Sequence, residues 1–275
     1  MALASLYSNQ KLNKIFSHYT SLDGFLNIIR ESQIRASNIL FLNDKEEMEY
    51  GIKIAKEVLA EFDKEEGRKR SSRSLKVQME IPDVYACCFC EEQDMLSQWR
   101  GYGAASQGVS IQFDADALAT LAKSHNFQLV TVKYGKKDAM SVLRERLQGA
   151  ETTASIIRSL IELKNEEDYT ADDVRRNMVL NLAPEFKNDA FKEECEWRIV
   201  ATANVVKQVH YRTRDNVIIP YVNIGNSNAR LPITRVTVGP GKDSNLTRKS
   251  IEKFLSSNLF YNNVDVGVSS IPFRT

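Results

Sequence analysis

The sequence is poor in the residues that bind zinc or cross-link small folds. Four cysteines are few for a chain of 275 residues, and Cys87, Cys88 and Cys90 share one β-like run, VYACCFC, rather than a disulfide-framework spacing. Cys87 and Cys90 form a C-x-x-C pair, but the three histidines are scattered, so two further zinc ligands are missing. We therefore expect a reducing compartment, no metal site, and thiols that serve as small buried hydrophobes.

The sequence also lacks an excess of charge of one sign and any long apolar run. Lysine and arginine number 37 against 36 aspartates and glutamates, which leaves a net charge of +1 and gives no support for nucleic acid as a partner. No apolar stretch approaches the roughly 20 residues that cross a bilayer, and the first residues, MALASLYSNQKLNK, lack the apolar core of a signal peptide. We expect a cytoplasmic protein with no membrane partner.

The remaining composition predicts one α+β domain over residues 1–275. Hydrophobic residues make up 43% of the chain, and we find no repeat and no Pro/Gly-rich linker. Strands are expected at 15–20, 34–42, 84–90, 108–113, 127–134, 194–203, 205–211, 217–222, 233–239 and 264–268. Helices are expected at 21–30, 45–62, from Asp94, after Asp114, within a helix-rich segment of about 137–192, and at 245–256. Strands from both chain ends then enclose a helical middle, which implies one mixed sheet.

Two helix starts carry polar caps. Thr20 with Asp23, and Asn43 with Glu46, have the spacing of a capping box. The acids around Asn43 and Asp44 are therefore explained by the helix dipole. A metal or ribose site that uses Asp44 and Glu47 stays open as an alternative.

The first candidate site is the tripeptide His18, Tyr19 and Thr20, where a strand ends and a helix begins. Backbone N–H groups at such a junction are free to bind a ligand. A histidine there can bond a ribose hydroxyl, and a tyrosine can stack on a flat ring. The alternative is a buried histidine bonded to the backbone, with Tyr19 in the core.

A second candidate lies in DMLSQWRGYG. Trp99 and Tyr102 are three residues apart on a predicted helix and can both belong to the core. Arg100 beside the glycine-flanked Tyr102 favours instead a turn that faces a ligand.

The strongest candidate is the run EECEWRIVAT. Strand alternation places Glu194, Glu196 and Arg198 on one face. A carboxylate on a rigid strand can stabilise a developing oxocarbenium cation, while Arg198 orients it or binds phosphate. An exposed face with a surface salt bridge is the alternative.

The last candidate lies near the end of the sequence. VGPGKDSN is read as a tight turn over Gly239–Gly241, because the G-x-x-x-x-G-K-[ST] pattern of a phosphate-binding loop is absent. Ser270 and Arg274 in SSIPFRT indicate a segment that closes over something.

These motifs in order, HYT, LNDKEE, CFCEEQDMLSQWRGYG, FKEECEWRIV and SSIPFR, resemble the bacterial domain of unknown function 2971 family over nearly the whole chain. The resemblance implies no particular reaction.

A looser resemblance is to the ADP-ribosyltransferase superfamily, and it implies a fold of that type and NAD as cofactor. Carried over, His18 holds the NAD ribose, Tyr19 or Tyr102 packs on the nicotinamide, and Glu196, accompanied by Glu194, stabilises the cation. An unknown macromolecular acceptor would receive the ADP-ribose. The other residues expected to contact the cofactor are Thr20, Trp99, Arg100, Arg198 and Arg274.

Two other functions remain open. A metal-dependent nuclease or phosphohydrolase would use Asp44, Glu47, Asp94 and Glu196 as oxygen ligands. A noncatalytic module of a defence or toxin system would recognise a small-molecule nucleotide without changing it.

Overall fold

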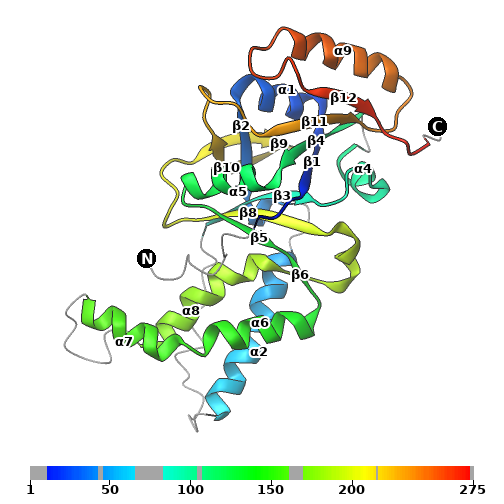
Figure 1. Cartoon of the computed structure of the whole chain (residues 1–275). Helices are drawn as coiled ribbons and strands as arrows, with labels where there is room; N and C mark the ends of the chain where they lie inside the picture. The colour runs from blue at the N-terminus through cyan, green and yellow to red at the C-terminus, as the bar shows by residue number, and fades with distance from the viewer. Residues whose placement is uncertain are drawn as a thin grey trace.

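The computed structural model describes residues 11–42, 46–65, 83–103, 107–160, 170–214 and 216–272, without the side chains of 46–48, 102 and 103. A large sheet with helices α1, α5 and α9 forms the upper part of the molecule in Figure 1, and helices α2, α6, α7 and α8 form the lower part. The predicted α+β class is confirmed.

The element bounds follow the chain order. The strands are β1 Ile15–Ser21, β2 Gln33–Asn38, β3 Val84–Cys90, β4 Gly108–Asp114, β5 Gln128–Thr131, β6 Lys133–Tyr134, β7 Phe186–Lys187, β8 Glu196–Thr202, β9 His210–Arg214, β10 Val217–Gly225, β11 Ile233–Val238 and β12 Asp265–Val268. The helices are α1 Leu22–Glu31, α2 Glu46–Glu65, α4 Leu96–Gly103, α5 Ala115–Ser124, α6 Lys136–Leu147, α7 Ala150–Leu160, α8 Ala171–Leu182 and α9 Ser244–Ser256. Short 3₁₀ turns are η1 Ile39–Phe41, η3 Ala183–Glu185 and η4 Asp189–Glu194.

One mixed sheet of ten strands joins both halves of the sequence, as predicted. Its order is β12-β11-β4-β1-β3-β2-β10-β9, and β8 pairs with β3 and in turn with β5. The pairs are antiparallel except for the parallel pair β11–β12. β3 pairs with β1 only at Ser17–Cys90, whereas it pairs with β8 along its whole length. The sheet therefore branches at β3.

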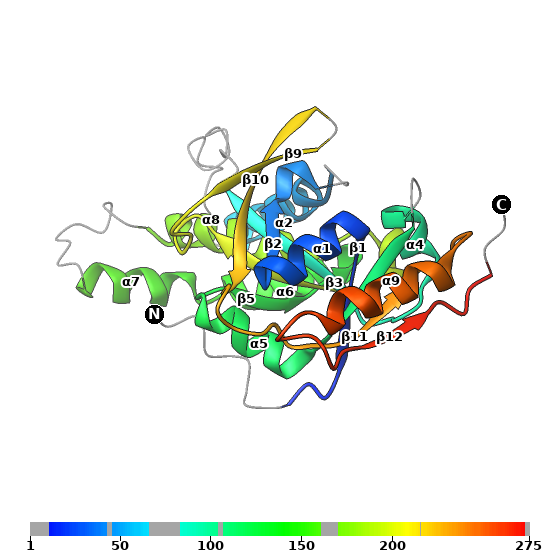
Figure 2. The ribbon, with the colours of Figure 1, turned by 90° about the horizontal axis from the view of Figure 1, so that it is seen from above.

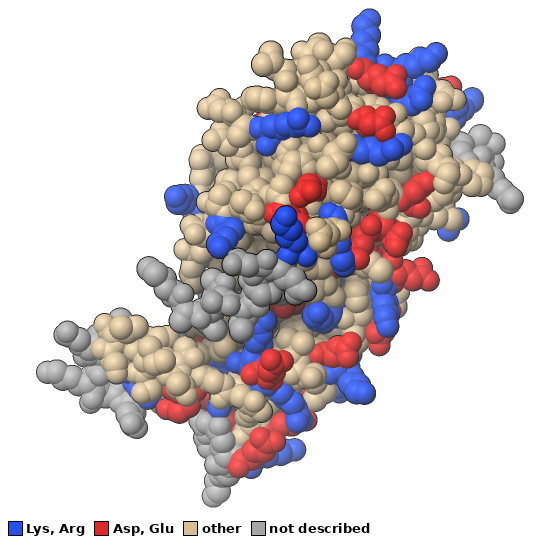
Figure 3. All heavy atoms as spheres, viewed as in Figure 1, with Lys and Arg blue, Asp and Glu red and all other residues tan. Residues whose placement is uncertain are grey.

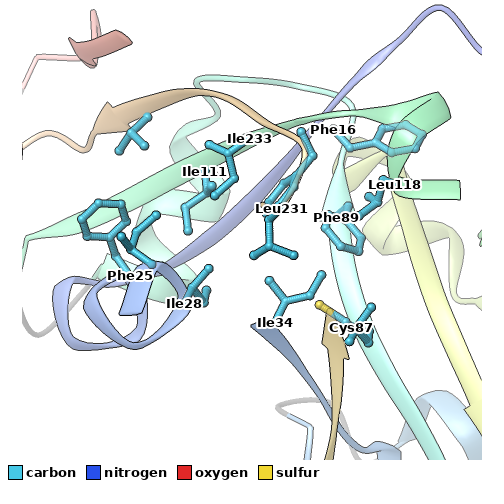
Figure 4. Close-up of a cluster of buried hydrophobic side chains, with 14 of the residues drawn as sticks. Phe16, Phe25, Ile28, Ile34, Cys87, Phe89, Ile111, Leu118, Leu231 and Ile233 are labelled. Atoms are coloured by element: carbon cyan, nitrogen blue, oxygen red, sulfur yellow. The ribbon is translucent and has the colours of Figure 1, made fainter. Parts of the chain in front are cut away.

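The main core lies on one face of this sheet. Apolar side chains alternate along β1, β3, β4 and β8, so that Phe16, Phe89, Ile111 and Trp197 point to the same side. Phe25 and Ile28 of α1 belong to the same cluster and lie beside Ile111 (Figure 4). This alternation sends the intervening side chains of the same strands to the opposite face, where the charged candidates lie.

The helical part has cores of its own and meets that opposite face. Helix α2 packs against α6 and α8 through Ile54, Val58, Leu143 and Val179. A smaller cluster, which includes Ile52, Val84 and Val200, joins α2 to β3 and β8. The predicted helix-rich segment is thus present as α6, α7 and α8, and the earlier helix α2 completes its layer (Figure 1). Among the described residues, no helix is both long enough and apolar enough to cross a membrane.

Several sequence-based predictions of local structure are wrong in detail. Ser21, not Thr20, caps α1, because its side chain accepts from the Gly24 N–H at 3.1 Å. Asp94 lies before α4 rather than in its first turn, since the first backbone hydrogen bond of the helix runs from the Trp99 N–H to the Met95 carbonyl. The strand predicted at 205–211 begins only at His210, where pairing with Tyr221 starts. Asn43 and Asp44 lie outside the described residues.

Candidate functional site

Glu196 and Arg198 share one face of β8, as the alternation predicts, but that face is buried. Arg198 has no exposed surface and Glu196 only 6%. Arg198 donates from Nε to Glu196 Oε1 at 2.7 Å and from Nη2 to Oε2 at 2.8 Å, while its Nη1 donates to the Pro184 carbonyl at 2.9 Å. Lys187 Nζ adds a third donor to Glu196 at 3.1 Å. The surface salt bridge considered as an alternative is therefore an enclosed ion network.

Glu194 reaches the same network from a different element. It ends η4, and Cys195 follows with a left-handed φ of 43°, so the strand alternation does not extend back to Glu194. Its carboxylate instead accepts from Lys187 Nζ at 2.7 Å. The prediction that Glu194 lies on the strand face is wrong, although Lys187 brings it close to Glu196.

The electrostatics fix Glu196 as an anion. Burial alone would raise the pKa of its carboxyl, but the charges and hydrogen bonds of Arg198 and the charge of Lys187 hold that pKa at about 2. Both carboxylate oxygens already accept hydrogen bonds from these cations. Glu196 could therefore stabilise a developing cation only by leaving these contacts.

His18 lies on the opposite face of the sheet from Glu196. It alternates with Tyr19 on β1 and so shares the face of Phe16, while Trp197 of β8 contacts Phe16 with ring centroids 4.9 Å apart. The His18 Nδ1 lies 2.9 Å from the Cys88 carbonyl oxygen, and burial is the main cause of a lowered His18 pKa. The structure therefore does not bring His18 and Glu196 to one ligand.

Tyr19 and Trp99 form part of a small buried cluster. Their rings pack edge to face with centroids 4.8 Å apart, and Cys90 completes the buried part of the cluster. The Tyr19 hydroxyl donates to the Glu92 carbonyl at 3.0 Å and accepts from the Met95 N–H at 3.1 Å. Both aromatic residues therefore occupy the core position that was the alternative to ligand stacking.

Asp94 is the centre of a bridge between α4 and the segment after β12. Its Oδ1 accepts from Trp99 Nε1 at 2.7 Å and from Ser269 Oγ at 2.6 Å. Its Oδ2 accepts from the Ser270 N–H at 2.8 Å and from Ser270 Oγ at 3.0 Å. What Ser270 closes over is thus the Asp94 carboxylate.

The other predicted site residues are dispersed. Arg100 is exposed on α4, and Thr20 is half-buried beside α1. The Tyr102 side chain and Arg274 lie outside what the structure describes. Of the proposed metal ligands, Asp94 and Glu196 are bound by the donors above, and no group of three or more His, Cys, Asp or Glu in the described part of the chain could hold a metal.

The structure assembles a basic and aromatic group that the sequence analysis missed. Arg35 of β2, Arg212 and His210 of β9, and Tyr221 of β10 share one face, because directly paired antiparallel residues project to the same side. His210 stacks on Tyr221 at 5.5 Å between ring centroids, and the Arg35 guanidinium lies 4.9 Å from the same Tyr221 ring centre. We call Arg35, His210, Arg212, Arg214 and Tyr221 the arginine group.

Among the cations of this group, Arg212 has the positive charge that neighbouring groups balance least. Its Nη2 donates to Ser37 Oγ at 3.0 Å, while its Nε is buried without a hydrogen-bond partner. Arg35 pairs with Glu31 at 3.1 Å, but no carboxylate among the described residues pairs with Arg212. Burial, followed by the charges of Arg214 and Arg35, lowers the Arg212 pKa. A half-buried guanidinium surrounded by cations is a place where an anion is stabilised.

This concentration is local. Over the face shown in Figure 3, Lys and Arg alternate with Asp and Glu and form no large patch of one sign, in agreement with the net charge of +1. A small anion that reaches two or three guanidiniums at once fits such a group better than a long polyanion does.

A pocket of about 270 Å³ adjoins the arginine group. His210 and Asn223 belong to its lining, together with His125, Phe127 and the loop that carries Val206. His125 Nε2 accepts from the Gly225 N–H at 3.1 Å, and the rings of His125 and Phe127 stack 5.5 Å apart. His210 is therefore both a wall of the pocket and the ring that stacks on Tyr221.

One local signal could have indicated this group. In HYRTR, residues 210–214, a histidine and two arginines occupy alternate positions, and they share a face if the strand predicted at 205–211 continues to Arg214. Arg35 and Ser37 carry no such signal, because only the pairing of β2 with β10 brings them near Arg212.

The fold is that of an α+β protein built on one branched, mixed sheet. The family described as "Protein of unknown function (DUF2971)" matches residues 98–199, from within α4 to within β8. The predicted resemblance to this family is confirmed over that stretch, which contains Lys187, Glu194, Glu196 and Arg198 but none of the arginine group. No curated protein and no solved structure matches the chain. The resemblance to ADP-ribosyltransferases finds no support in these comparisons.

Proposed function

We propose that the chain is a nucleotide-binding module that holds the phosphates of a small-molecule nucleotide on Arg212 and the guanidiniums beside it. The observation that carries the proposal is the half-buried Arg212, which has two arginine neighbours and no paired carboxylate among the described residues. A bound phosphate would supply the missing negative charge beside the guanidinium.

The neighbouring rings support a nucleotide rather than a bare anion. Tyr221 and His210 offer stacked aromatic surface beside the cations, and the pocket begins at His210. Arginine forks match phosphate oxygens in pairs, and aromatic faces bind flat heterocycles. Both kinds of contact lie on one side of the β9–β10 pair.

Binding of a nucleotide without a chemical reaction agrees best with the positions of the acidic residues Glu196 and Asp94. Glu196 is saturated by Arg198 and Lys187, and it lies across the sheet from His18. Asp94 is saturated by Trp99, Ser269 and Ser270. Transfer of ADP-ribose from NAD by Glu196, Glu194 and His18 stays a prediction from the sequence, and NAD is one member of the ligand class.

The test is calorimetric titration with ATP, NAD and inorganic tripolyphosphate. Replacing Arg212 by glutamine in Arg212→Gln should weaken binding roughly ten- to hundredfold, because one or two charge-assisted hydrogen bonds worth about 1.5–3 kcal/mol each are lost. Arg235→Gln is the matched control, since Arg235 is a half-exposed arginine of β11, paired with Asp265 and near the opposite end of the strand order from β9.

Two outcomes would contradict the proposal. One is the absence of binding by any of the three ligands, and the other is an equal loss of affinity in Arg212→Gln and Arg235→Gln. Release of nicotinamide from NAD, abolished by Glu196→Gln in a variant that is still folded and still binds NAD, would instead support the enzymatic hypothesis.

A further inference from the structure

The pocket borders an open stretch of strand edge. β9 pairs with β10 from Arg214–Val217 to His210–Tyr221 and no further, so β10 continues to Gly225 without β9 beside it. The Gly225 N–H donates to His125 Nε2, and it therefore points away from β2. Because N–H and C=O groups alternate sides along an antiparallel strand, those of Asn223 point to this same open side.

Asn223 thus presents a donor and an acceptor next to each other. Among the described residues, no hydrogen bond uses its backbone N–H or C=O on the open side, and its side-chain Oδ1 is buried without a partner. Asn223 and Gly225 both line the pocket. Backbone groups left unpaired at the wall of a pocket favour a polar ligand that pairs with them.

The volume of the pocket limits which part of a nucleotide can fit inside it. Its 270 Å³ lies just below the roughly 300–1,000 Å³ of ordinary ligand pockets, so it suits one ring system and not a dinucleotide. Arg212 is two residues along β9 from His210 in the pocket wall, which separates them by roughly 7 Å. A base in the pocket can therefore be joined through a ribose to phosphates on Arg212.

We propose that this pocket binds an adenine base, paired through its edge with the backbone N–H and C=O of Asn223. The inference rests on the proposed function, because the phosphates of the same ligand are taken to lie on Arg212. Adenine offers the required neighbours, an N7 acceptor beside an N6 amino donor, whereas guanine presents two acceptors, N7 and O6, on that edge. The ligand class is therefore an adenosine phosphate.

The experiment compares ATP, GTP and inorganic tripolyphosphate by calorimetry on the wild-type chain and on Val206→Trp. Val206 lines the pocket, so the larger side chain should fill it. Wild type should bind ATP roughly ten- to hundredfold more tightly than tripolyphosphate or GTP, because two hydrogen bonds and ring contacts are added. Val206→Trp should reduce ATP affinity to that of tripolyphosphate while leaving tripolyphosphate binding unchanged.

Retained tripolyphosphate binding also shows that Val206→Trp is folded. Val268→Trp, at an exposed position of β12, is the matched control and should bind ATP as wild type does. Equal affinity for ATP, GTP and tripolyphosphate, or an ATP affinity that Val206→Trp does not change, would overturn the adenine pocket and leave the phosphate site intact. Failure of all three ligands to bind wild type would overturn the phosphate site, and the adenine pocket with it.

Discussion

Among single side chains, Glu196 is a buried anion whose charge is balanced by ion pairs with Arg198 and Lys187. Glu196→Gln would leave both cations buried with one partner fewer, and should lower the free energy of unfolding by about 3–5 kcal/mol. Glu252→Gln, at an exposed position of α9, should change it by about 0.5 kcal/mol or less. Urea unfolding of the two variants measures the difference.

An unchanged stability of Glu196→Gln would show that the ion network does not hold the fold. The contacts of Glu196 with Arg198 and Lys187 would then contribute little to the free energy of unfolding.

Glu185 makes stability depend on pH in the opposite sense to most carboxylates. Burial raises its pKa to about 7, although Arg146 and Lys133 oppose the shift. Between the ordinary value of 4.5 and 7, the folded chain binds a proton that the unfolded chain has released, so stability falls as pH rises through this window. Glu185→Gln should remove the fall and stabilise the chain at pH 8 by on the order of 2 kcal/mol.

Urea unfolding at pH 5 and pH 8 tests this, and the gain should be larger at pH 8. Glu145→Gln, an exposed position on α6, serves as the control and should show no such difference. A gain of equal size at both pH values would contradict a raised Glu185 pKa.

At the scale of elements, Asp94 fastens the segment after β12 to α4. Asp94→Ala removes the acceptor for the Trp99 indole, both serine hydroxyls and the Ser270 N–H, and leaves the half-enclosed indole N–H unpaired. We expect a loss of about 2–3 kcal/mol and faster amide hydrogen exchange at Ser270. Exchange measured by mass spectrometry on peptides that cover 265–272 tests both the release and its location.

Asp265→Ala is the control, because its ion pair with Arg235 is exposed and should contribute little. Equal exchange at Ser270 in wild type and Asp94→Ala would show that the segment is held by other contacts.

Elements whose signal is local were predictable from the sequence. The apolar run of β3 and the alternating run of β4 were placed within a residue of their bounds. The error at Glu194 has a local cause that a hydropathy pattern does not contain, since the left-handed φ of Cys195 starts β8 two residues later than alternation suggested. The Trp99–Asp94 bond likewise depends on a side-chain direction that spacing alone leaves open.

At the scale of the molecule, the sequence does not show that the members of the arginine group come together. Its members come from β2 and from the β9–β10 pair, a hairpin that projects beyond the rest of the sheet when seen from above (Figure 2). The hydrogen bond between Arg212 and Ser37 joins residues 175 positions apart. Alternation within β9 and within β2 indicates which side chains share a face. It does not indicate that β10 pairs with both strands, because nothing in either strand specifies its partner.

That separation has a consequence for how the chain acquires its fold during synthesis. A ribosome adds about 5–20 residues per second, so β2 waits on the order of ten to thirty seconds before β10 is available to pair with it. Throughout that interval one edge of β2 has no sheet partner, a condition that invites wrong pairing. The proposed phosphate-binding face cannot form before β9 and β10 have been synthesised, so a nucleotide would stabilise only late states of folding and not the early intermediates.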